Sequence, residues 1–398
     1  MDDKFSTTSQ IELTRRSLLG YVGAAAGAAA LAGVMPKAAS AATPAVKAYG
    51  VPTSALKDWT PMEKSIGITC ELSGANNDVG VFMRDIMASD IGKEMDIFTF
   101  ESGTQNILGP KGFYARLDEK HPELTLWQRT SDDWKRSPLA VDPDGNQWGV
   151  PMIGNADSFG YFPAAVGVPA GSTEELSWSL VFDDEKTHGR VAYGKVYAYS
   201  MGTAALYLQS KGATFGNLAD LTPAEAKTVA DFLIERKKAG QFRTLYDAFE
   251  EQIQLLTNKE VDVINCWEPA VREANNTLGP NTVFYAYTKE GYNKWGIAAY
   301  ISAQAIARGN GDNIYKVLNY FLGGEYHALQ ARDRGYGGPN LDLAVEYAEK
   351  SGWSADEVAA LKATEEKVRK KFTKPYVSFT TPKNASAMEE EWQRFLNA

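Results

Sequence analysis

Apolar runs and amphipathic stretches alternate along the first part of the chain, which predicts alternating strands and helices. In chain order, the predicted elements are a strand at 46–49, a helix at 54–64, a strand at 66–70, a helix at 78–87 and a strand at 95–100. This order is typical of an open α/β sheet with parallel strands, in which ligands bind in the loops that follow the strands. Two such loops, at 70–77 and 101–105, are therefore candidate binding loops.

A second α/β series follows a turn at 142–145 and an extended run at 148–153. Thr222 and Glu225, with Pro223 between them, form a capping-box pattern that predicts a helix ending at Gly240. The other predicted elements are a β-rich run at 190–199, helices at 201–212, 246–257, 314–322 and from 353 onward, strands at 261–266 and 282–287, and an extended segment at 296–307. The simplest architecture for this order is two α/β lobes joined by extended crossings.

The first 41 residues contain the features of an export signal in their usual order. Arg15 and Arg16 precede an apolar segment at 18–34, and residues 39–41 read Ala-Ser-Ala, an A-x-A cleavage pattern. The segment resembles a twin-arginine signal peptide, which implies export by the twin-arginine translocase into a bacterial periplasm. Its apolar stretch of about 17 residues is shorter than the roughly 20 needed to span a bilayer, so we expect a soluble mature protein. An uncleaved amphiphilic N-terminal helix is the alternative.

Charge and residue spacing narrow the classes of function. The 41 Lys and Arg residues against 50 Asp and Glu give a formal net charge of -9, which disfavours nucleic acid as the main partner. Two cysteines and three histidines stand far apart in the sequence, at Cys70, Cys266, His121, His188 and His327, and their spacing matches no metal site. The sequence contains no G-x-S-x-G or H-E-x-x-H pattern, and no GxGxxG that opens a helix after a strand. We therefore expect no metal, no cofactor and no enzymatic activity.

Seven segments occur in the order found in one known family. They read MDIFTFESGT, WGVPMIGNADSFGY, WSLVFDDEKTHGRV, GATFGNLADLTPAEAKTVADFLIERKK, TNKEVDVINCWEP, NKWGIAAYISAQA and NIYKVLNYFLGGEYHALQARDRGYGGPN. Over nearly all of residues 45–341, the chain resembles the spermidine/putrescine-binding branch of the periplasmic solute-binding proteins of bacterial ABC importers. The resemblance implies a type II fold, with two α/β lobes that close around one small solute. It also implies a monomeric receptor whose partner is an ABC permease in the inner membrane.

The resemblance implies a division of the chain into lobes. After a signal peptide at 1–41, lobe I comprises 42–155 plus 295–340, and lobe II comprises 156–294 plus 341–398. Cys70 and Cys266 then fall in different lobes, where a disulfide would lock the hinge. We therefore expect two free thiols.

Two tryptophans match pocket tryptophans of the polyamine binders. Trp267 follows the predicted strand at 261–266, and Trp295 lies in the segment NKWGIAAYI. The alternative for each is packing in a core or between the lobes. Two acidic anchors of the polyamine binders are absent, since Ile297 stands at one position and residues 195–200 contain no acid. The departures disfavour spermidine and putrescine themselves.

Three other acids stand at candidate cleft positions. Asp157 lies where the chain is expected to cross between lobes, Glu268 follows Trp267, and Glu101 ends the predicted strand at 95–100. Aromatic faces and desolvated carboxylates are among the few side-chain groups that offset the dehydration of an ammonium ion. The pattern predicts a cationic nitrogen solute, such as a polyamine relative, a betaine or a basic amino-acid derivative. Each acid taken alone has a solvated or structural role as its alternative.

Other residues complete the candidate site. A neutral or anionic solute would instead use the backbone N–H groups of the turn at Ser102 and Thr104, if a helix begins there. Tyr336 lies in a glycine-rich segment that matches a cleft-lining segment of the family. Tyr199 and Tyr161 are further candidates of the same kind.

Two other classes stay open at this stage. Three neighbouring tyrosines, Tyr285, Tyr287 and Tyr292, would suit an iron-type or other metal receptor of the same fold. A twin-arginine signal also suits an exported cofactor enzyme, because that route carries proteins that are already folded.

Overall fold

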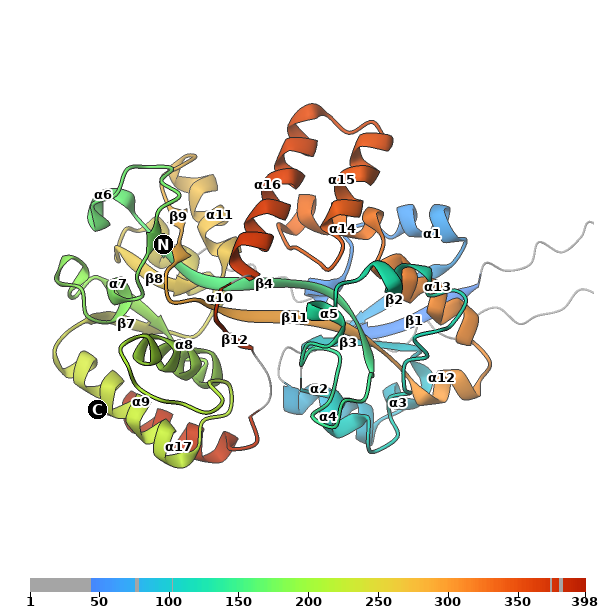
Figure 1. The fold of residues 1–398 in the computed structure, drawn as a ribbon, viewed down its shortest axis with the longest axis horizontal. Helices are drawn as coiled ribbons and strands as arrows, with labels where there is room; N and C mark the ends of the chain where they lie inside the picture. The colour runs from blue at the N-terminus through green and yellow to red at the C-terminus, as the bar shows by residue number, and fades with distance from the viewer. Residues whose placement is uncertain (1–43, 76–78, 102, 373, 379–381) are drawn as a thin grey trace, which may run out of the picture. The chain divides into compact units, whose positions relative to one another are not determined.

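The computed structural model describes residues 44–75, 79–101, 103–372, 374–378 and 382–398 (Figure 1). The predicted export signal and Ser102 lie outside the described residues. Within the described residues, no helix is both long enough and apolar enough to cross a membrane.

The described strands form one large mixed sheet and one small pair. The large sheet has the order β2-β1-β3-β11-β4-β8-β6-β7, with β12 paired to β11 and β9 paired to β4, and the small pair is β5 with β10. The strands are β1 (Ala45–Gly50), β2 (Thr69–Gly74), β3 (Ile97–Glu101), β4 (Gly149–Tyr161), β5 (Glu175–Leu176), β6 (Val191–Gly194), β7 (Phe242–Tyr246), β8 (Val263–Cys266), β9 (Phe284–Tyr285), β10 (Tyr287–Thr288), β11 (Tyr292–Ile301) and β12 (Tyr376–Ser378).

The strands at the two ends of the sheet are parallel, as the sequence predicted. β1 pairs in parallel with β2 and β3, and β6 pairs in parallel with β7 and β8. The two long strands β4 and β11 lie between these groups and pair with each other in antiparallel fashion. Figure 1 shows them running side by side from one lobe to the other. The predicted extended crossings are therefore the two central strands of the sheet.

Each lobe has its own hydrophobic core. The core of the first lobe joins residues of β1, β3 and β11 to helices on either side, and Phe82, Phe98 and Tyr300 are fully buried in it. The core of the second lobe joins β6 to α8, α9 and the C-terminal α17, around Trp178 and Tyr193. A third cluster packs α10 and α11 on the other side of β8. The fold is thus the two-lobed α/β arrangement that the sequence predicted.

The described helices cover these sheets and connect the strands. They are α1 (Thr60–Ile66), α2 (Val79–Ala88), α3 (Ile91–Glu94), α4 (Gln105–Leu108), α5 (Asp132–Lys135), α6 (Pro163–Val166), α7 (Ser179–Phe182), α8 (Tyr197–Ser210), α9 (Pro223–Lys238), α10 (Phe249–Thr257), α11 (Glu268–Leu278), α12 (Ala303–Ala307), α13 (Gly311–Phe321), α14 (Gly324–Arg334), α15 (Leu341–Lys350), α16 (Ala355–Phe372) and α17 (Ala385–Leu396), with short 3-10 turns at Pro52–Ser54, Thr125–Arg129 and Glu185–Thr187. The capping box of Thr222 and Glu225 is formed at the start of α9, as predicted.

Several predicted boundaries were wrong. The helix predicted at 54–64 begins only at Thr60, with Pro61 in its first turn. Tyr199 was placed in a β-rich run but lies in α8, because the strand before it ends at Gly194. The strand β7 ends at Tyr246, which had been predicted as the first residue of a helix at 246–257. The extended run predicted at 148–153 is only the first part of the 13-residue strand β4.

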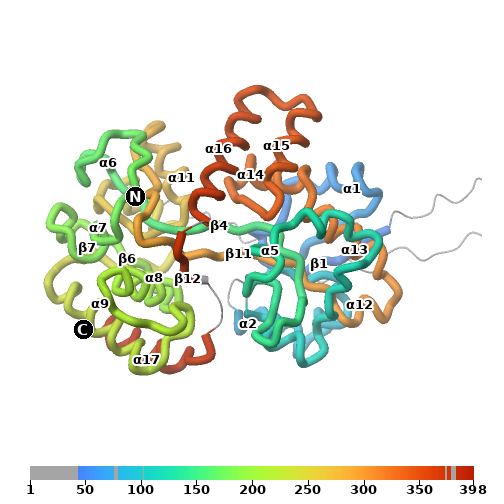
Figure 2. The backbone as a smooth tube through the Cα atoms, viewed as in Figure 1, coloured from blue at the N-terminus to red at the C-terminus, as the bar shows by residue number. Residues whose placement is uncertain are grey.

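Helices α14, α15 and α16 form a separate bundle beside the crossing strands (Figure 2). Leu329 of α14 belongs to the core of the first lobe, so the bundle is anchored there. The C-terminal end of α16 contacts β4, and the chain then passes through β12 to α17 on the second lobe. One long helix therefore ends at the point where the two lobes meet.

Candidate functional site

The register of the crossing strands places several predicted site residues on one face of the sheet. In β4 and β11, Asp157 pairs with Asn293, and Asn155 pairs with Trp295. Directly paired residues point to the same face, as do residues two apart along a strand. All four side chains therefore share one face at the junction of the lobes.

Glu101 lies on the same face, further into the first lobe. It pairs with Ile297 of β11, two residues beyond Trp295. From position 293 to 297 a strand advances about 14 Å, so the Asp157 and Glu101 carboxyl groups are separated by roughly that distance along the strand. Burial raises the pKa of Glu101 to about 7.

Asp157 is a buried carboxyl group that lacks part of its hydrogen bonding. Its side chain is 1% exposed. Its Oδ1 accepts a long hydrogen bond from Asn155 Nδ2, at 3.3 Å, and lies 3.4 Å from the Tyr285 hydroxyl oxygen, whose proton is donated to the Cys266 carbonyl oxygen at 2.7 Å. Its Oδ2 is buried with no hydrogen-bond partner among the described residues. Burial raises the pKa of Asp157 to about 8, against a smaller opposing effect of Lys371.

Aromatic side chains surround this carboxyl group. Trp295 and Tyr336 pack edge to face with their ring centres 5.2 Å apart. Burial and the nearby Asp157 carboxyl raise the pKa of Tyr336 to about 12, and the same two causes raise the pKa values of Tyr199 and Tyr285. An acid beside the electron-rich faces of aromatic rings is the surrounding that attracts an organic cation.

Unpaired polar atoms gather around the same residues. The Tyr199 hydroxyl and Asn265 Nδ2 are buried without hydrogen-bond partners in the described part of the chain, and Trp295, whose Nε1 has no partner at hydrogen-bond distance there, faces Asp157 and lowers the pKa of its carboxyl group. Asn265 lies on β8, one residue before the Cys266 carbonyl that accepts the Tyr285 hydroxyl proton. Buried polar atoms in folded proteins are nearly always hydrogen-bonded. Several unpaired atoms near Asp157 therefore indicate a place built to receive polar groups of a ligand.

Glu268 begins α11, beside Asp157. Asn155 Nδ2 lies 3.4 Å from Glu268 Oε2, so one amide group contacts both acids. Unlike Asp157, Glu268 is fully paired, with Lys367 Nζ at 2.6 Å and Lys371 Nζ at 3.2 Å. Burial opposes ionisation of Glu268, but the two ammonium groups together hold its pKa well below the usual range.

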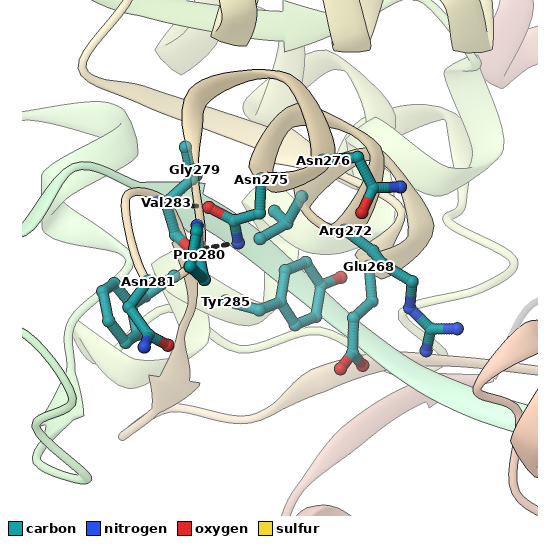
Figure 3. Close-up of a pocket in the computed structure, with 11 residues that line it drawn as sticks. Glu268, Arg272, Asn275, Asn276, Gly279, Pro280, Asn281, Val283 and Tyr285 are labelled. Carbon is teal, nitrogen blue, oxygen red and sulfur yellow. Dashed lines mark hydrogen bonds between the residues drawn. The ribbon is translucent and has the colours of Figure 1, made fainter.

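A pocket of about 630 Å³ opens beside these residues, between α11 and the chain at 279–285 (Figure 3). Figure 3 shows Glu268, Arg272 and Tyr285 toward one end of it and residues 279–281 toward the other. The Arg272 guanidinium reaches Gly335 at the end of α14, where φ is +75° and a Cβ would collide with it. The pocket thus runs from the surface of the second lobe to the contact between the lobes.

A second pocket, of about 480 Å³, lies at the crossing strands near Trp134 and Trp295. Lys294 lines this pocket, and its ammonium nitrogen lies 3.7 Å from the centre of the Tyr376 ring and 4.5 Å from the centre of the Phe372 ring. Burial lowers the pKa of Lys294 to about 8. These aromatic faces already hold a cation of the protein.

The remaining predicted residues lie elsewhere. Tyr161 is buried in the core of the second lobe against Phe159, and Thr104 is buried beneath the Tyr114 hydroxyl. Trp267 is the residue before α11, where it stacks on Phe249 and is 37% exposed. The structure therefore brings Asp157, Trp295, Tyr336, Tyr199 and Glu268 together, and places Tyr161 and Thr104 in packing positions.

One N–H group of the turn considered for an anion is already paired within the described residues. The Gly103 N–H donates to Gln105 Oε1 at 2.9 Å, and α4 after it has only four residues. Of the three tyrosines considered for a metal, Tyr287 lies under Lys370, and the rings of Tyr285 and Tyr292 lie 4.6 Å and 5.8 Å from Lys371 Nζ. An ammonium group of the protein therefore already lies between two of them. Within the described residues, no group of three or more His, Cys, Asp or Glu side chains could hold a metal ion.

The cysteines are buried and unbridged. Cys70 lies in β2 and Cys266 in β8, on different lobes. Burial raises the pKa of Cys70 to about 12 and that of Cys266 further still. Neither thiol is a reactive group at neutral pH.

Sequence reasoning missed four residues of the site: Asn155, Lys367, Lys371 and the role of Tyr285 beside Asp157. The two lysines are four residues apart on α16, a spacing that places them on one helix face. Their partner Glu268 is 99 and 103 residues away in sequence. The lysine spacing was visible in the sequence, whereas the acid that faces them was not.

The ligand-free protein should lose stability as the pH rises toward 9. An aspartate has an ordinary pKa near 4, and that of Asp157 is raised to about 8 in the folded protein. The resulting stabilisation is fully present below about pH 4 and is lost as the pH rises through 8. Thermal unfolding between pH 5 and 9 should show a steeper decline for the wild type than for Asp157→Asn. Parallel declines would show that Asp157 titrates normally.

Comparisons with known proteins give matches among solved structures alone. No protein-family model matches the chain, and no curated protein matches it. A spermidine/putrescine ABC transporter protein from Listeria monocytogenes is similar, with a TM-score of 0.63 and 17% identity, over 88% of this chain and 98% of that one. The spermidine/putrescine substrate-binding protein PotD from Streptococcus pneumoniae has a TM-score of 0.62 and 14% identity, over 89% and 99%.

A third similar structure is named for a different ligand. It is the Atu4243–GABA receptor, with a TM-score of 0.58 and 18% identity, over 89% of this chain and 96% of that one. At these identities the similarity describes the fold. The chain therefore has the two-lobed α/β fold of the substrate-binding proteins of bacterial ABC transporters.

Proposed function

We propose that the protein is a periplasmic solute receptor that binds a small cationic nitrogen compound between its lobes and delivers it to an ABC permease. The observation that carries the proposal is the Asp157 carboxyl group, which is buried at the lobe junction with Oδ2 unpaired among the described residues. Lys371 acts on this carboxyl group without hydrogen-bonding to it, so Oδ2 still favours a cation that donates a hydrogen bond directly. The solute is a polyamine relative, a betaine or a basic amino-acid derivative.

The surrounding rings support the same class of solute. Trp295 and Tyr336 place aromatic rings near Asp157, whereas the Tyr285 ring already lies against the Lys371 ammonium group. Cation–π attraction is strongest where water is excluded. Glu101, on the same face of the sheet, supplies a second carboxyl group at the first-lobe end. A solute with one charged nitrogen at Asp157 and a polar group toward Glu101 would contact both lobes.

Binding would act through closure of the lobes. The crossing strands β4 and β11 carry Asp157 and Trp295, while Tyr199, Glu268 and Tyr336 come from separate helices and loops. A solute favours the closed form only by the difference between its affinities for the closed and open forms. Contacts from both lobes supply that difference. We also propose that the protein acts as a monomer and reaches the periplasm through the twin-arginine signal at 1–41.

A thermal-shift screen of the protein from Ala42 onward tests this function. The panel contains amines, betaines, amino acids, sugars, organic acids, phosphonates and metal ions. A ligand that binds only the folded form raises the melting temperature by mass action. We expect a saturable shift from cationic nitrogen compounds, with no chemical change of the compound on prolonged incubation. A shift confined to metal ions or anions, or turnover of the bound compound, would contradict the proposal.

Trp267→Ala should weaken solute binding by well over tenfold. Trp267 directly precedes Glu268, and its ring stacks on Phe249 and is 37% exposed, so we propose that it forms part of the wall of the site. Loss of such an aromatic anchor costs about 2 kcal/mol. Titration calorimetry with the solute selected by the screen measures the change, and Tyr161→Phe, a core substitution, serves as the control. An unchanged dissociation constant in Trp267→Ala would remove Trp267 from the site.

A further inference from the structure

Lys371 occupies a cation-binding environment inside the protein. Its side chain is 2% exposed, and Nζ lies 3.2 Å from Glu268 Oε2 and 3.1 Å from the Ala156 carbonyl oxygen. The same ammonium group lies 4.6 Å from the centre of the Tyr285 ring. A carboxylate, a carbonyl oxygen and an aromatic face are the groups that would receive an organic ammonium ion.

This environment adjoins the Asp157 carboxyl group. The Ala156 carbonyl that Lys371 contacts belongs to the residue before Asp157, and Asn155 Nδ2 contacts both Asp157 and Glu268. The two acids differ in one respect. Glu268 has two ammonium groups bonded to it, from Lys367 and Lys371, whereas Asp157 Oδ2 accepts no hydrogen bond within the described residues and feels Lys371 only at longer range. The cluster therefore contains two neighbouring cation positions, of which the protein fills one.

We infer that Lys371 is a specificity-determining residue that fills the second cation position and excludes short diamines. This inference rests on the proposed function, since it assumes that the solute places a charged nitrogen at Asp157. A short diamine would need a second free carboxylate a few carbon atoms from the first. The neighbouring carboxylate, Glu268, is already paired with lysine side chains of the protein. The solute at this end of the site carries a single charged nitrogen, as in a monoamine, a betaine or an amino acid.

Lys371 also fits this role by its place in the fold. It lies in the last turn of α16, whose bundle is anchored on the first lobe, and its partner Glu268 starts α11 of the second lobe. The bond between them therefore joins the two lobes. A solute ammonium could replace Lys371 only by breaking this contact, which raises the cost for a second charge.

The test compares matched monoamines and diamines by titration calorimetry at pH 8. The probes are butylamine with 1,4-diaminobutane and propylamine with 1,3-diaminopropane. Wild type should bind each monoamine more than tenfold tighter than its diamine. Lys371→Met, which keeps the length and apolar stem of the side chain, should shift this ratio at least tenfold toward the diamines. Lys371→Arg keeps the charge and should leave the ratio as in the wild type.

The double variant Lys371→Met with Glu268→Gln is the matched control. It removes the charges of Lys371 and Glu268 together and leaves Lys367, whose side chain is 20% exposed, without its carboxylate partner, and it should show no gain for diamines. If wild type binds monoamines but the ratio is unchanged in Lys371→Met, the role of Lys371 is overturned while the proposed function stands. If wild type binds neither series nor any other cation, the proposed function is contradicted, and the inference about Lys371 falls with it. Equal gains in the single and double variants would also overturn the inference, because Glu268 would then contribute nothing.

Discussion

Asp157→Asn is expected to weaken the binding of a cationic probe such as butylamine by at least about 30-fold at pH 8.5. The amide has nearly the same shape and can still accept the hydrogen bond from Asn155 Nδ2. It lacks the negative charge that the bound cation needs, and losing one partner of a buried charge pair costs about 2–5 kcal/mol. Titration calorimetry on both proteins measures the ratio of dissociation constants.

A charge-matched control separates this effect from a general change in electrostatics. Glu94 is an exposed acid in α3, on the first lobe, and Glu94→Gln removes the same charge at a residue that lies outside both pockets. This variant should bind the probe within about twofold of wild type, because exposed charges are screened by water and salt. Equal losses in both variants would show that Asp157 acts through net charge alone and is no direct contact.

Glu268→Gln is expected to lower the free energy of unfolding by about 3–5 kcal/mol at pH 7. The substitution leaves the buried Lys371 ammonium group with the Ala156 carbonyl as its remaining polar contact, and breaking a buried ion pair from one side costs this much. Burial already lowers the pKa of Lys371, and the negative charge of Glu268 offsets part of that effect. Urea unfolding of both proteins measures the difference.

An exposed ion pair provides the comparison for Glu268. Lys362 Nζ lies 2.8 Å from Glu349 Oε1, and both side chains are more than half exposed. Glu349→Gln should cost less than about 1 kcal/mol, since exposed pairs contribute little. If Glu268→Gln costs no more than Glu349→Gln, the Glu268 cluster does not stabilise the junction of the lobes.

The fold could be predicted from local patterns because each lobe repeats strands and helices with clear apolar periods. The capping box at Thr222 and the parallel strands at both ends of the sheet follow from such patterns. The crossing strand β4 was harder, since Asn155, Asp157 and Ser158 interrupt its apolar run although all are buried. Its true length depends on pairing with β11, which lies more than 130 residues away.

The candidate site was only partly predictable for the same reason. Asp157 could be proposed from its place where the chain was expected to cross between lobes, and Trp295 from the resemblance to a known family. Their common face depends on the register of β4 against β11, which no local pattern specifies. Whether an acid is free or paired depends on distant residues, as Glu268 and Lys371 show. Tyr161 was misplaced because an aromatic residue at a strand end looks the same whether it lines a cleft or a core.

The proton released on cation binding tests the central claim most directly. Burial raises the pKa of Asp157 so far that its carboxyl group is largely protonated at pH 7. It must lose that proton to pair with butylammonium, which stays charged at this pH. Calorimetric titrations in buffers of different ionisation enthalpy should therefore give close to one proton released per amine bound in wild type, and markedly less in Asp157→Asn. Binding without proton release, or equal release from both proteins, would show that the cation does not bind at Asp157.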